Sequence, residues 1–444
     1  MVPNSAYLKS LDRLFNAGSH PKLGLSRMNA LLERLGNPHH KMRFLHVAGT
    51  NGKGSVCAML DAMLAADGVP RGLYTSPHLA SARERISING RMISEEFFVA
   101  LEAQVFEATY GLYEMPTFFE RMTAMAFLAF EAERVDVAVL EVGLGGRLDA
   151  TNVVTPLVCG ITRIDLDHQH VLGNTPEAIA REKAGIMKPG VPVVSSLQLP
   201  SVTEVLVECA GKQSAPLYQV GNDLQIERSA EGIGLYWGAK EILPPAKPAL
   251  RGPHQHGNVA VAVGMLERAD LVSDVKKRRQ GVENTLWPGR FEVFHGTKRA
   301  PVVVLDGAHN PCGIQSLMDG LASDDQFVGR RYHVVLGTTR GHDALPILQI
   351  LLKSINPASL TLTQSRSPRS LDANELAAVA RTAGFSEPSV ERNVGSALRQ
   401  AKEKAAASDS VCDEVVLVTG SLYLVGQVRA MLCDMPEDPE FPHF

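Results

Sequence analysis

The chain has 444 residues, of which 45% are hydrophobic and 21% charged, and its formal net charge is −4 at pH 7. This composition is typical of a globular protein, and the weak negative charge gives no electrostatic footprint for nucleic acid. No apolar run reaches the length of a membrane span, and the first residues lack the order of a signal peptide. Six cysteines stand singly, which favours reduced thiols in the cytoplasm over a disulfide framework or a zinc site.

The length exceeds one typical core, so we expect two domains. Strand-like and helix-like segments alternate, which predicts an α/β fold with mostly parallel strands. In the first part we expect strands at 44–48, 135–140, 157–164 and 191–195, and helices at 56–66, 95–110, 119–133 and 176–186. Shorter alternating pieces over 224–243 predict a small antiparallel excursion.

A second alternating series begins near residue 300, with strands expected at 302–305, 333–336, 359–363 and 415–419. Between the two series, residues 286–291 (LWPGRF) carry a Pro-Gly break, which favours a linker. We therefore expect a domain over 1–290 and a smaller one over 291–444. The tail from Asp434 is expected to be frayed.

Residues 44–55 (FLHVAGTNGKGS) show an apolar strand and a glycine-rich turn, and a helix follows at once. Glycines let backbone N–H groups approach an anion, the helix N-terminus adds its dipole, and Lys53 supplies a positive charge for the terminal phosphates. The hydroxyl of Thr50 or Ser55 is suited to the shell of a nucleotide-bound Mg²⁺. The segment therefore predicts a binding site for a nucleoside triphosphate.

This loop departs from the pattern G-x-x-x-x-G-K-[ST]. Val47 stands in place of the first glycine, and Gly54 separates Lys53 from Ser55. An ordinary glycine-rich turn is the alternative, but the strand–turn–helix order favours a phosphate loop.

Polar residues follow several predicted strands where each strand ends. Because ligands of parallel sheets collect beyond the carboxyl ends of the strands, these residues are candidates for one shared site. The segments are Glu141 with the glycines after it, 165–168 (DLDH), 306–311 (DGAHNP) and 419–421 (TGS).

Glu141 follows a buried strand in a chain with a phosphate loop, which suits a carboxylate that holds Mg²⁺ directly or through water. A helix-capping acid is the alternative. His168 and His170 form a His-x-His pair, but no further Cys or His cluster completes a tetrahedral zinc site, so a structural role stays open. By themselves, Lys183, residues 74–79 and residues 83–85 would be interpreted as a solvated helix residue, a turn and a charged surface run.

At these residues the chain resembles the folylpolyglutamate synthase and dihydrofolate synthase family, a branch of the Mur-type ATP-dependent amide ligases. The matching segments are 49–55 (GTNGKGS), 75–79 (TSPHL), 83–86 (RERI), 141–152 (EVGLGGRLDATN), 167–173 (DHQHVLG), 181–186 (REKAGI), 288–291 (PGRF), 306–311 (DGAHNP) and 420–423 (GSLY). The ordered set is far more specific than any one segment. The resemblance implies an N-terminal P-loop ATPase-type, mostly parallel sheet with helices on both faces, and a smaller C-terminal Rossmann-like α/β domain.

The resemblance also implies roles for individual residues. The nucleotide contacts would be Thr50, Asn51, Gly52, Lys53, Gly54, Ser55, Asn258, Arg290, Asp306 and His309. The metal ligands would be Ser76, Glu141 and His168, and the catalytic residues Lys53, His168, Arg290 and a carbamylated Lys183. The folate precursor would contact Lys22, Leu23, Gly24, Arg85, Thr117, Phe118, Phe119, Glu120, Leu148, Asp149 and Ala150.

We accordingly expect a cytoplasmic, monomeric ATP-dependent ligase that binds Mg²⁺ as two ions, with K⁺ left open as a further cation. Its substrates would be dihydropteroate, reduced folates and L-glutamate, joined through an acyl phosphate, with neither nucleic acid nor membrane as partner. A monofunctional folylpolyglutamate synthase or a peptidoglycan-type Mur ligase is the alternative within the ligases. A P-loop switch ATPase and a Rossmann oxidoreductase are the rivals from other classes.

Three segments depart from the family pattern: Phe118, residues 254–258 (HQHGN) and residues 340–343 (RGHD). The last stands where an Asp-Lys-Asp type segment is usual. It leaves open the substrate contacts of the second domain.

Overall fold

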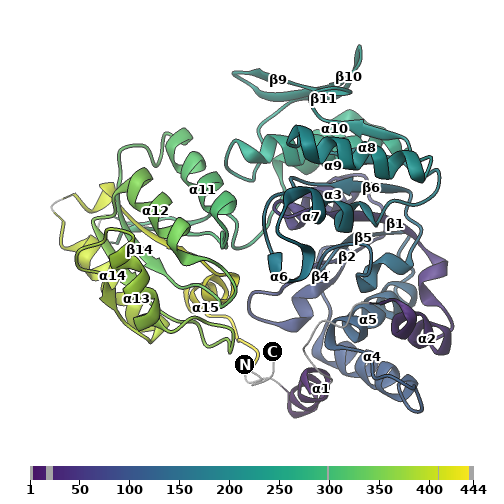
Figure 1. The fold of residues 1–444 in the computed structure, drawn as a ribbon, viewed down its shortest axis with the longest axis horizontal. Coiled ribbons are helices and arrows are strands. Elements are labelled where there is room, and N and C mark those ends of the chain that lie inside the picture. Colours follow the sequence, from purple (N-terminus) through teal and green to yellow (C-terminus); the bar gives the residue numbers. More distant parts are fainter. Residues whose placement is uncertain (1–3, 17–23, 298–299, 409, 440–444) are drawn as a thin grey trace.

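The computed structural model describes residues 4–16, 24–297, 300–408 and 410–439, and the predicted contacts Lys22 and Leu23 lie outside them. The chain forms two lobes, each built around its own sheet (Figure 1). The first sheet has eight strands in the order β4-β3-β2-β5-β1-β6-β7-β8. They are β1 Arg43–Ala48, β2 Arg71–Tyr74, β3 Ile86–Ile88, β4 Arg91–Met92, β5 Val137–Glu141, β6 Val158–Ile161, β7 Val193–Ser195 and β8 Leu217–Gln219. The neighbouring strands β2, β5, β1, β6, β7 and β8 pair in parallel. At one edge, β3 pairs antiparallel with both β2 and β4.

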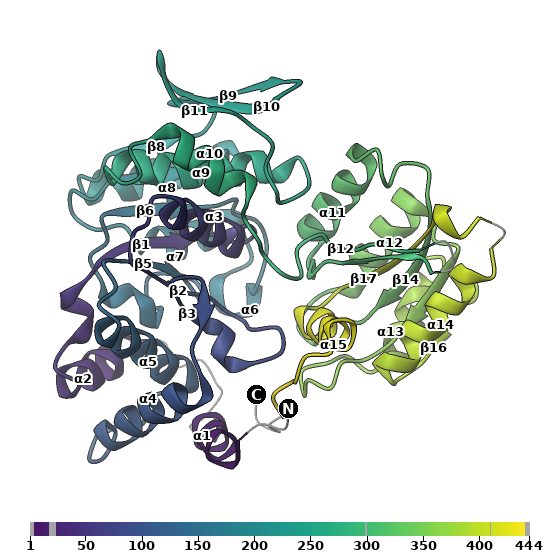
Figure 2. The same ribbon diagram turned by 180° about the vertical axis from the view of Figure 1, so that it is seen from behind.

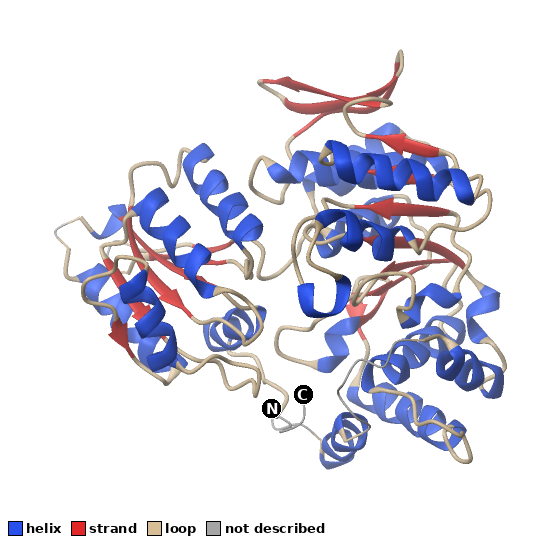
Figure 3. Cartoon of the chain, viewed as in Figure 1, coloured by secondary structure: helices blue, strands red, loops and turns tan. Residues whose placement is uncertain are grey.

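Helices cover both faces of this sheet (Figure 3). Alternate residues of β1 show why: Leu45 and Val47 are buried in the core beneath α3 and α9, while Phe44 is buried with α5 on the other face. The helices of this part are α1 Ser5–Phe15, α2 Ser26–Arg34, α3 Lys53–Ala66, α4 Glu95–Ala108, α5 Phe118–Ala132, α6 Gln169–Leu172, α7 Pro176–Ala184, α8 Pro200–Lys212, α9 His254–Arg268 and α10 Val275–Glu283. A strand buried on both faces has a continuous apolar sequence, which is why these strands could be predicted.

A three-stranded antiparallel sheet projects from the first lobe beside α9 and α10 (Figure 2). Its strands are β9 Leu224–Ser229, β10 Gly232–Trp237 and β11 Lys240–Ala246. The predicted antiparallel excursion is confirmed.

The second lobe contains a six-stranded sheet in the order β12-β13-β17-β14-β15-β16, parallel except for β12. The strands are β12 Glu292–Phe294, β13 Val302–Leu305, β14 Arg331–Leu336, β15 Ser359–Leu362, β16 Ser389–Val390 and β17 Glu414–Thr419. The helices are α11 Pro311–Ser323, α12 Ala344–Ile355, α13 Ala373–Thr382, α14 Val394–Ala406 and α15 Leu422–Cys433. The predicted fold class is confirmed. The domain boundary between residues 290 and 291 stays a prediction, although β12 already belongs to the second sheet.

The prediction of a frayed tail is wrong for its described part. The carboxylate of Asp438 accepts hydrogen bonds from the Tyr7 hydroxyl at 2.7 Å and from the Ala82 backbone at 2.6 Å. The backbone N–H of Asp438 donates to the carbonyl of Ala80 at 2.8 Å. The tail therefore leads from α15 of the second lobe back to the first. Within the described ranges, no helix combines the length and apolarity that a membrane crossing requires.

Candidate active site

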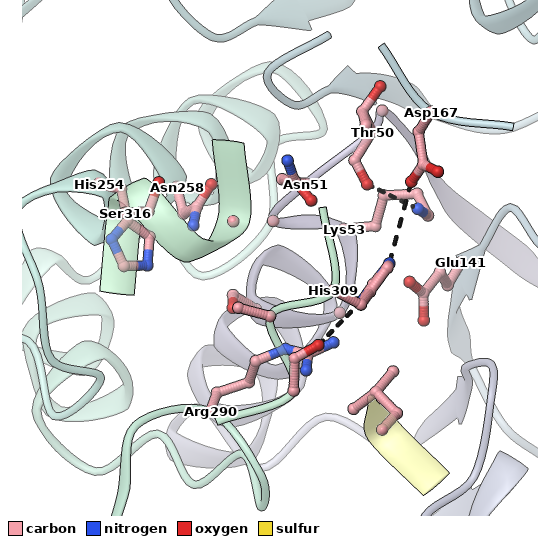
Figure 4. Close-up of a pocket in the computed structure, with 18 of the residues that line it drawn as sticks. Thr50, Asn51, Lys53, Glu141, Asp167, His254, Asn258, Arg290, His309 and Ser316 are labelled. Atoms are coloured by element: carbon pink, nitrogen blue, oxygen red, sulfur yellow. Dashed lines mark hydrogen bonds and ion pairs between the residues drawn. The ribbon is translucent and has the colours of Figure 1, made fainter. Parts of the chain in front are cut away.

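A cavity of about 190 Å³ lies between the two lobes (Figure 4). It is lined by residues that follow β1, β5 and β6 of the first sheet and β13 of the second. Every residue predicted to contact nucleotide or metal, or to act in catalysis, lines it: Thr50, Asn51, Gly52, Lys53, Gly54, Ser55, Ser76, Glu141, His168, Lys183, Asn258, Arg290, Asp306 and His309. Their roles stay predictions, but the structure brings them together.

The phosphate-loop segment ends in the N-terminus of α3. Gly52 is the N-cap residue with φ 92°, and no side chain caps the helix. The first N–H groups of a helix have no partner within it, so they are available to an anion in the cavity. The Lys53 ammonium donates to the Thr50 carbonyl at 3.2 Å, which holds the positive charge at the same end.

Close packing explains the glycines of this loop. A Cβ on Gly49 would lie 1.8 Å from Thr162 Oγ1, and one on Gly52 would lie 2.5 Å from Asn258 Oδ1. A Cβ on Gly54 would lie 2.9 Å from the indole ring of Trp287, which belongs to the linker between the lobes. The glycine that breaks the usual phosphate-loop pattern is therefore the one on which the linker packs.

Thr50 is held by the loop after β6. Its hydroxyl donates to the Asp165 carbonyl at 3.0 Å and accepts from the Asp165 N–H at 3.1 Å. The backbone N–H groups of Thr50 and Asn51 both donate to the Arg163 carbonyl, at 3.0 and 3.3 Å. The N–H groups of the loop that remain available to an anion are therefore those from Gly52 onward.

Glu141 ends β5, and its side chain is buried beside the cavity. Burial raises the pKa of its carboxyl group, while the charges of Lys53 and Arg290 and a 3.1 Å hydrogen bond from the Ser76 N–H favour the ionised form. A carboxylate, a hydroxyl and an imidazole line the same cavity at Glu141, Ser76 and His168. In the described residues no group of three or more His, Cys, Asp or Glu side chains is arranged to hold a metal. This donor set fits Mg²⁺, which takes one or two protein carboxylates together with substrate phosphates and water, better than it fits zinc.

Lys183, at the end of α7, is buried, which contradicts its interpretation as a solvated helix residue. Its ammonium donates to the Gly49 carbonyl at 2.8 Å. Burial, followed by the charge of Lys53, lowers the pKa of Lys183 to about 7. A large fraction of this lysine is therefore a neutral, nucleophilic amine near neutral pH.

The second lobe contributes the loop after β13. Both carboxylate oxygens of Asp306 accept backbone N–H groups, from Phe291 and Ala308, each at 2.8 Å. Burial raises the pKa of Asp306, and the Arg290 charge opposes that rise. His309 Nδ1 lies 2.8 Å from the Gly307 carbonyl oxygen, which turns its Nε2 toward the first lobe.

Histidines from both lobes surround Asp167 of the loop after β6. Its carboxylate oxygens lie 3.9 Å from His168 Nε2, 3.9 Å from His309 Nε2 and 3.8 Å from His342 Nδ1. Burial lowers the pKa of His168 and of His309 to about 4, so both rings are neutral near pH 7. His342 belongs to residues 340–343, the segment that departs from the family pattern. This segment therefore lies where the second lobe meets the first.

Of the predicted contacts of the folate precursor, none that the structure describes is part of the lining of this cavity. Thr117 and Glu120 form the capping box of α5, and Glu120 is also paired with Arg27 at 3.1 Å. The Arg85 guanidinium is buried, lies 5.0 Å from the Phe118 ring centroid and donates to His78 Nδ1 at 3.0 Å. The interpretation of residues 83–85 as a charged surface run is therefore wrong for Arg85.

Other predicted contacts of the folate precursor are likewise engaged in packing or hydrogen bonds within the first lobe. Phe119 packs on Gly143, where a Cβ would lie 2.4 Å from its ring, and Ala150 shares a core with Phe118. The Asp149 carboxylate accepts from the N–H groups of Gly143, Leu144 and Thr151 and from the Thr151 hydroxyl. The partly exposed Gly24 and Leu148 complete the described set. Contact of these residues with a substrate stays a prediction.

Several residues at the site were not predicted, among them Asp167 as a carboxylate between the lobes, Trp287 on the phosphate loop, and Asn310 and His342 from the second lobe. Asp167 and Asn310 stood inside recognised strand-end segments, which was the available signal. Trp287 stood in the expected linker and His342 in a segment that departs from the family pattern, but neither observation placed the residue at the site.

Comparisons with known proteins agree with this geometry. Residues 290–431 match a family model described as dihydrofolate synthetase, C-terminal domain. The chain is 36% identical over 430 residues to the dihydrofolate synthase/folylpolyglutamate synthase of Bacillus subtilis, covering 93% of this chain and 95% of that protein. It is similar to the Mycobacterium tuberculosis folylpolyglutamate synthase complexed with ADP, with a TM-score of 0.89, 33% identity and coverage of 97% and 99% of the two chains. It is also similar to a bifunctional folylpolyglutamate synthase/dihydrofolate synthase with Mn, AMPPNP and L-glutamate bound, with a TM-score of 0.83, 33% identity and coverage of 98% of both chains.

Proposed function

Because the chain belongs to the folylpolyglutamate synthase/dihydrofolate synthase family, we propose that it uses ATP to add L-glutamate both to dihydropteroate and to the glutamyl chain of reduced folates. The observation that carries this proposal is the single cavity that joins the uncapped N-terminus of α3 to Glu141, Lys183 and the second-lobe residues Asp306 and His309. A monofunctional folylpolyglutamate synthase would need nearly the same site and is the alternative.

The reaction requires activation of a carboxylate. The substrate carboxylate attacks the γ-phosphorus of ATP, forming an acyl phosphate and releasing ADP. The glutamate amine then attacks the acyl carbon, the C–O bond to phosphate breaks, and phosphate and a proton leave. Lys53, Arg290 and the N–H groups of α3 offset the charge of the transferring phosphoryl group.

Metal and lysine chemistry belong to the same proposal. Ser76, Glu141 and His168 are the residues that would hold Mg²⁺, which would offset phosphate charge when bound. Lys183 is proposed to react as a neutral amine with CO₂, forming a carbamate and releasing a proton. Its pKa of about 7 supports this, because the protonated form has no lone pair for the new N–C bond. The carbamate would be an additional anionic oxygen ligand at the cavity, suited to a second Mg²⁺ or to K⁺.

We also propose a cytoplasmic monomer with a domain boundary at residues 290 and 291. The six free cysteines support a reducing compartment.

The test of function measures ADP release that depends on glutamate, with dihydropteroate and with a tetrahydrofolate in parallel. Release with both acceptors supports the bifunctional enzyme. Release with the tetrahydrofolate alone would identify the monofunctional alternative. ATP hydrolysis that neither acceptor nor glutamate stimulates would contradict the proposal and favour a switch ATPase.

A further inference from the structure

Asn310 joins the two lobes at the cavity. It is 3% exposed and precedes α11, and its Oδ1 accepts from the Gly313 N–H at 2.8 Å as the helix cap. The same side chain forms a reciprocal amide pair with Asn51 of the phosphate loop, with the two N···O distances 3.1 and 3.2 Å. Its Nδ2 also donates to Asp167 Oδ2 at 3.2 Å. One side chain thus holds a helix of the second lobe against two loops of the first.

We propose that Asn310 is the positioning residue that couples ATP use to glutamate addition in this enzyme. The inference rests on the proposed function. Asn310 places α11, whose residues Gly313, Ser316 and Leu317 form part of the cavity wall, against the phosphate loop. It also places its neighbour His309, whose Nε2 lies 3.9 Å from Asp167.

The chemistry explains why this position matters for coupling. An acyl phosphate reacts with water as well as with an amine. With water it returns the carboxylate and phosphate, so the net reaction is ATP hydrolysis without a new amide bond. A wall that moves away from the phosphate loop admits water and loosens the orientation of the amine.

Two variants separate this role from helix capping. Asn310→Ser keeps a capping oxygen but is too short to reach Asn51 and Asp167. Asn393→Ser is the matched control, because Asn393 caps α14 by accepting from the Ser396 N–H at 2.9 Å and is exposed.

The measurement is the ratio of ADP released to glutamate incorporated. For Asn310→Ser we expect kcat for ligation to fall about tenfold, because the three hydrogen bonds to Asn51 and Asp167 are lost. The ratio of ADP released to glutamate incorporated should rise to about three or more. The KM for ATP should change less than kcat, because Asn51, the predicted nucleotide contact in the bridge, is itself unchanged in this variant. The Asn393→Ser enzyme should keep the wild-type ratio.

Exchanging the amide of Asn310 with the carboxylate of Asp167 tests the contact between these two side chains directly. Asn310→Asp keeps the cap but sets a carboxylate against that of Asp167, and should raise the ratio further. Adding Asp167→Asn restores an amide–carboxylate pair with the roles reversed, and should lower the ratio again.

The inference is overturned if Asn310→Ser keeps the wild-type ratio, if Asn393→Ser raises it equally, or if the swap gives no recovery. Small-angle X-ray scattering with ADP supplies a readout that does not need ligation. The radius of gyration of Asn310→Ser should exceed that of the wild type, and equal radii would overturn the inference. A wild-type protein that ligates no glutamate would instead contradict the proposed function.

Discussion

The Nζ atom of Lys183 lies 2.8 Å from the carbonyl oxygen of Gly49, so the last turn of α7 directly contacts the residue that opens the phosphate loop. Because the side chain is buried with Lys53 nearby, the pKa of Lys183 is lowered to about 7. This pair leads to the first prediction.

Lys183→Ala should lower ligase activity by about a hundredfold, as expected when a charged group is removed from a preorganised site. A short carboxylic acid such as acetate should restore part of it by replacing the carbamate. Lys188→Ala is the matched control, since Lys188 donates to the Asn152 carbonyl and does not line the cavity. Activity of Lys183→Ala equal to that of the wild type would contradict the carbamate.

The lowered pKa of Lys183 also sets a pH dependence. Below pH 7 the amine is protonated and does not react with CO₂, while above pH 7 it is increasingly neutral. After CO₂ is removed, reactivation at a fixed concentration of dissolved CO₂ should therefore be faster at pH 8 than at pH 6. Steady-state ligation monitored during CO₂ addition measures this, and Lys183→Ala should show no such reactivation.

The acyl-phosphate route predicts the fate of an oxygen atom. With ¹⁸O in the substrate carboxylate, one labelled oxygen should appear in the released phosphate. The O–P bond formed in the first step survives the second step, in which the C–O bond breaks. Mass spectrometry of the phosphate measures the label. Unlabelled phosphate after glutamate-dependent turnover excludes this route.

Gly54→Ala should weaken ATP binding by about tenfold, because its Cβ would lie 2.9 Å from the Trp287 ring and force the loop or the linker to move. Gly211→Ala is the control, since a Cβ at Gly211 in α8 meets nothing within 4 Å. That change should leave ATP binding intact and stabilise the helix by up to about 1 kcal/mol. Adding Trp287→Leu to Gly54→Ala should recover binding, and a failure to recover would show that the contact with Trp287 is not the cause.

The buried ion pair of Arg27 and Glu120 should matter for stability. Glu120→Ala should lower the free energy of unfolding by about 3–5 kcal/mol, because it leaves the buried Arg27 charge without its buried partner. Glu114 also pairs with Arg27, at 3.2 Å, but is 48% exposed. Glu114→Ala should therefore cost less than about 1 kcal/mol. Chemical denaturation measures both, and equal losses would contradict this account.

The central strands and part of the cavity lining could be predicted because the signals were local. Central parallel strands are continuous apolar runs, and the residues after them share one edge of the sheet, so the order of the chain made Glu141 and Asp306 candidates for one site. The role predicted for Asp306 came from the family resemblance. By contrast, β2 is only four residues long and contains Gly72, where an added Cβ would lie 2.6 Å from the Phe130 ring. Its glycine is explained by a neighbour that is distant in sequence, so the strand was not expected.

Contacts between the lobes could not be predicted for the same reason. Asn310 and Asn51 are separated by 259 positions, and no periodicity links them. Arg85 and Lys183 have the sequence surroundings of solvated charges, yet both are buried by packing that only the folded chain defines. The tail was expected to fray because it contains prolines and acids, but Asp438 finds three partners on the first lobe.

The return of this tail has a mechanical consequence. The second lobe is attached to the first covalently through residues 286–291 and again, by hydrogen bonds, at Asp438. At the cavity the lobes are also joined by the Asn310–Asn51 pair, by His309 and His342 beside Asp167, and by the Arg251–Asp324 ion pair at 2.6 Å. Separation of the lobes must break these non-covalent contacts, while the linker keeps the second lobe tethered to the first.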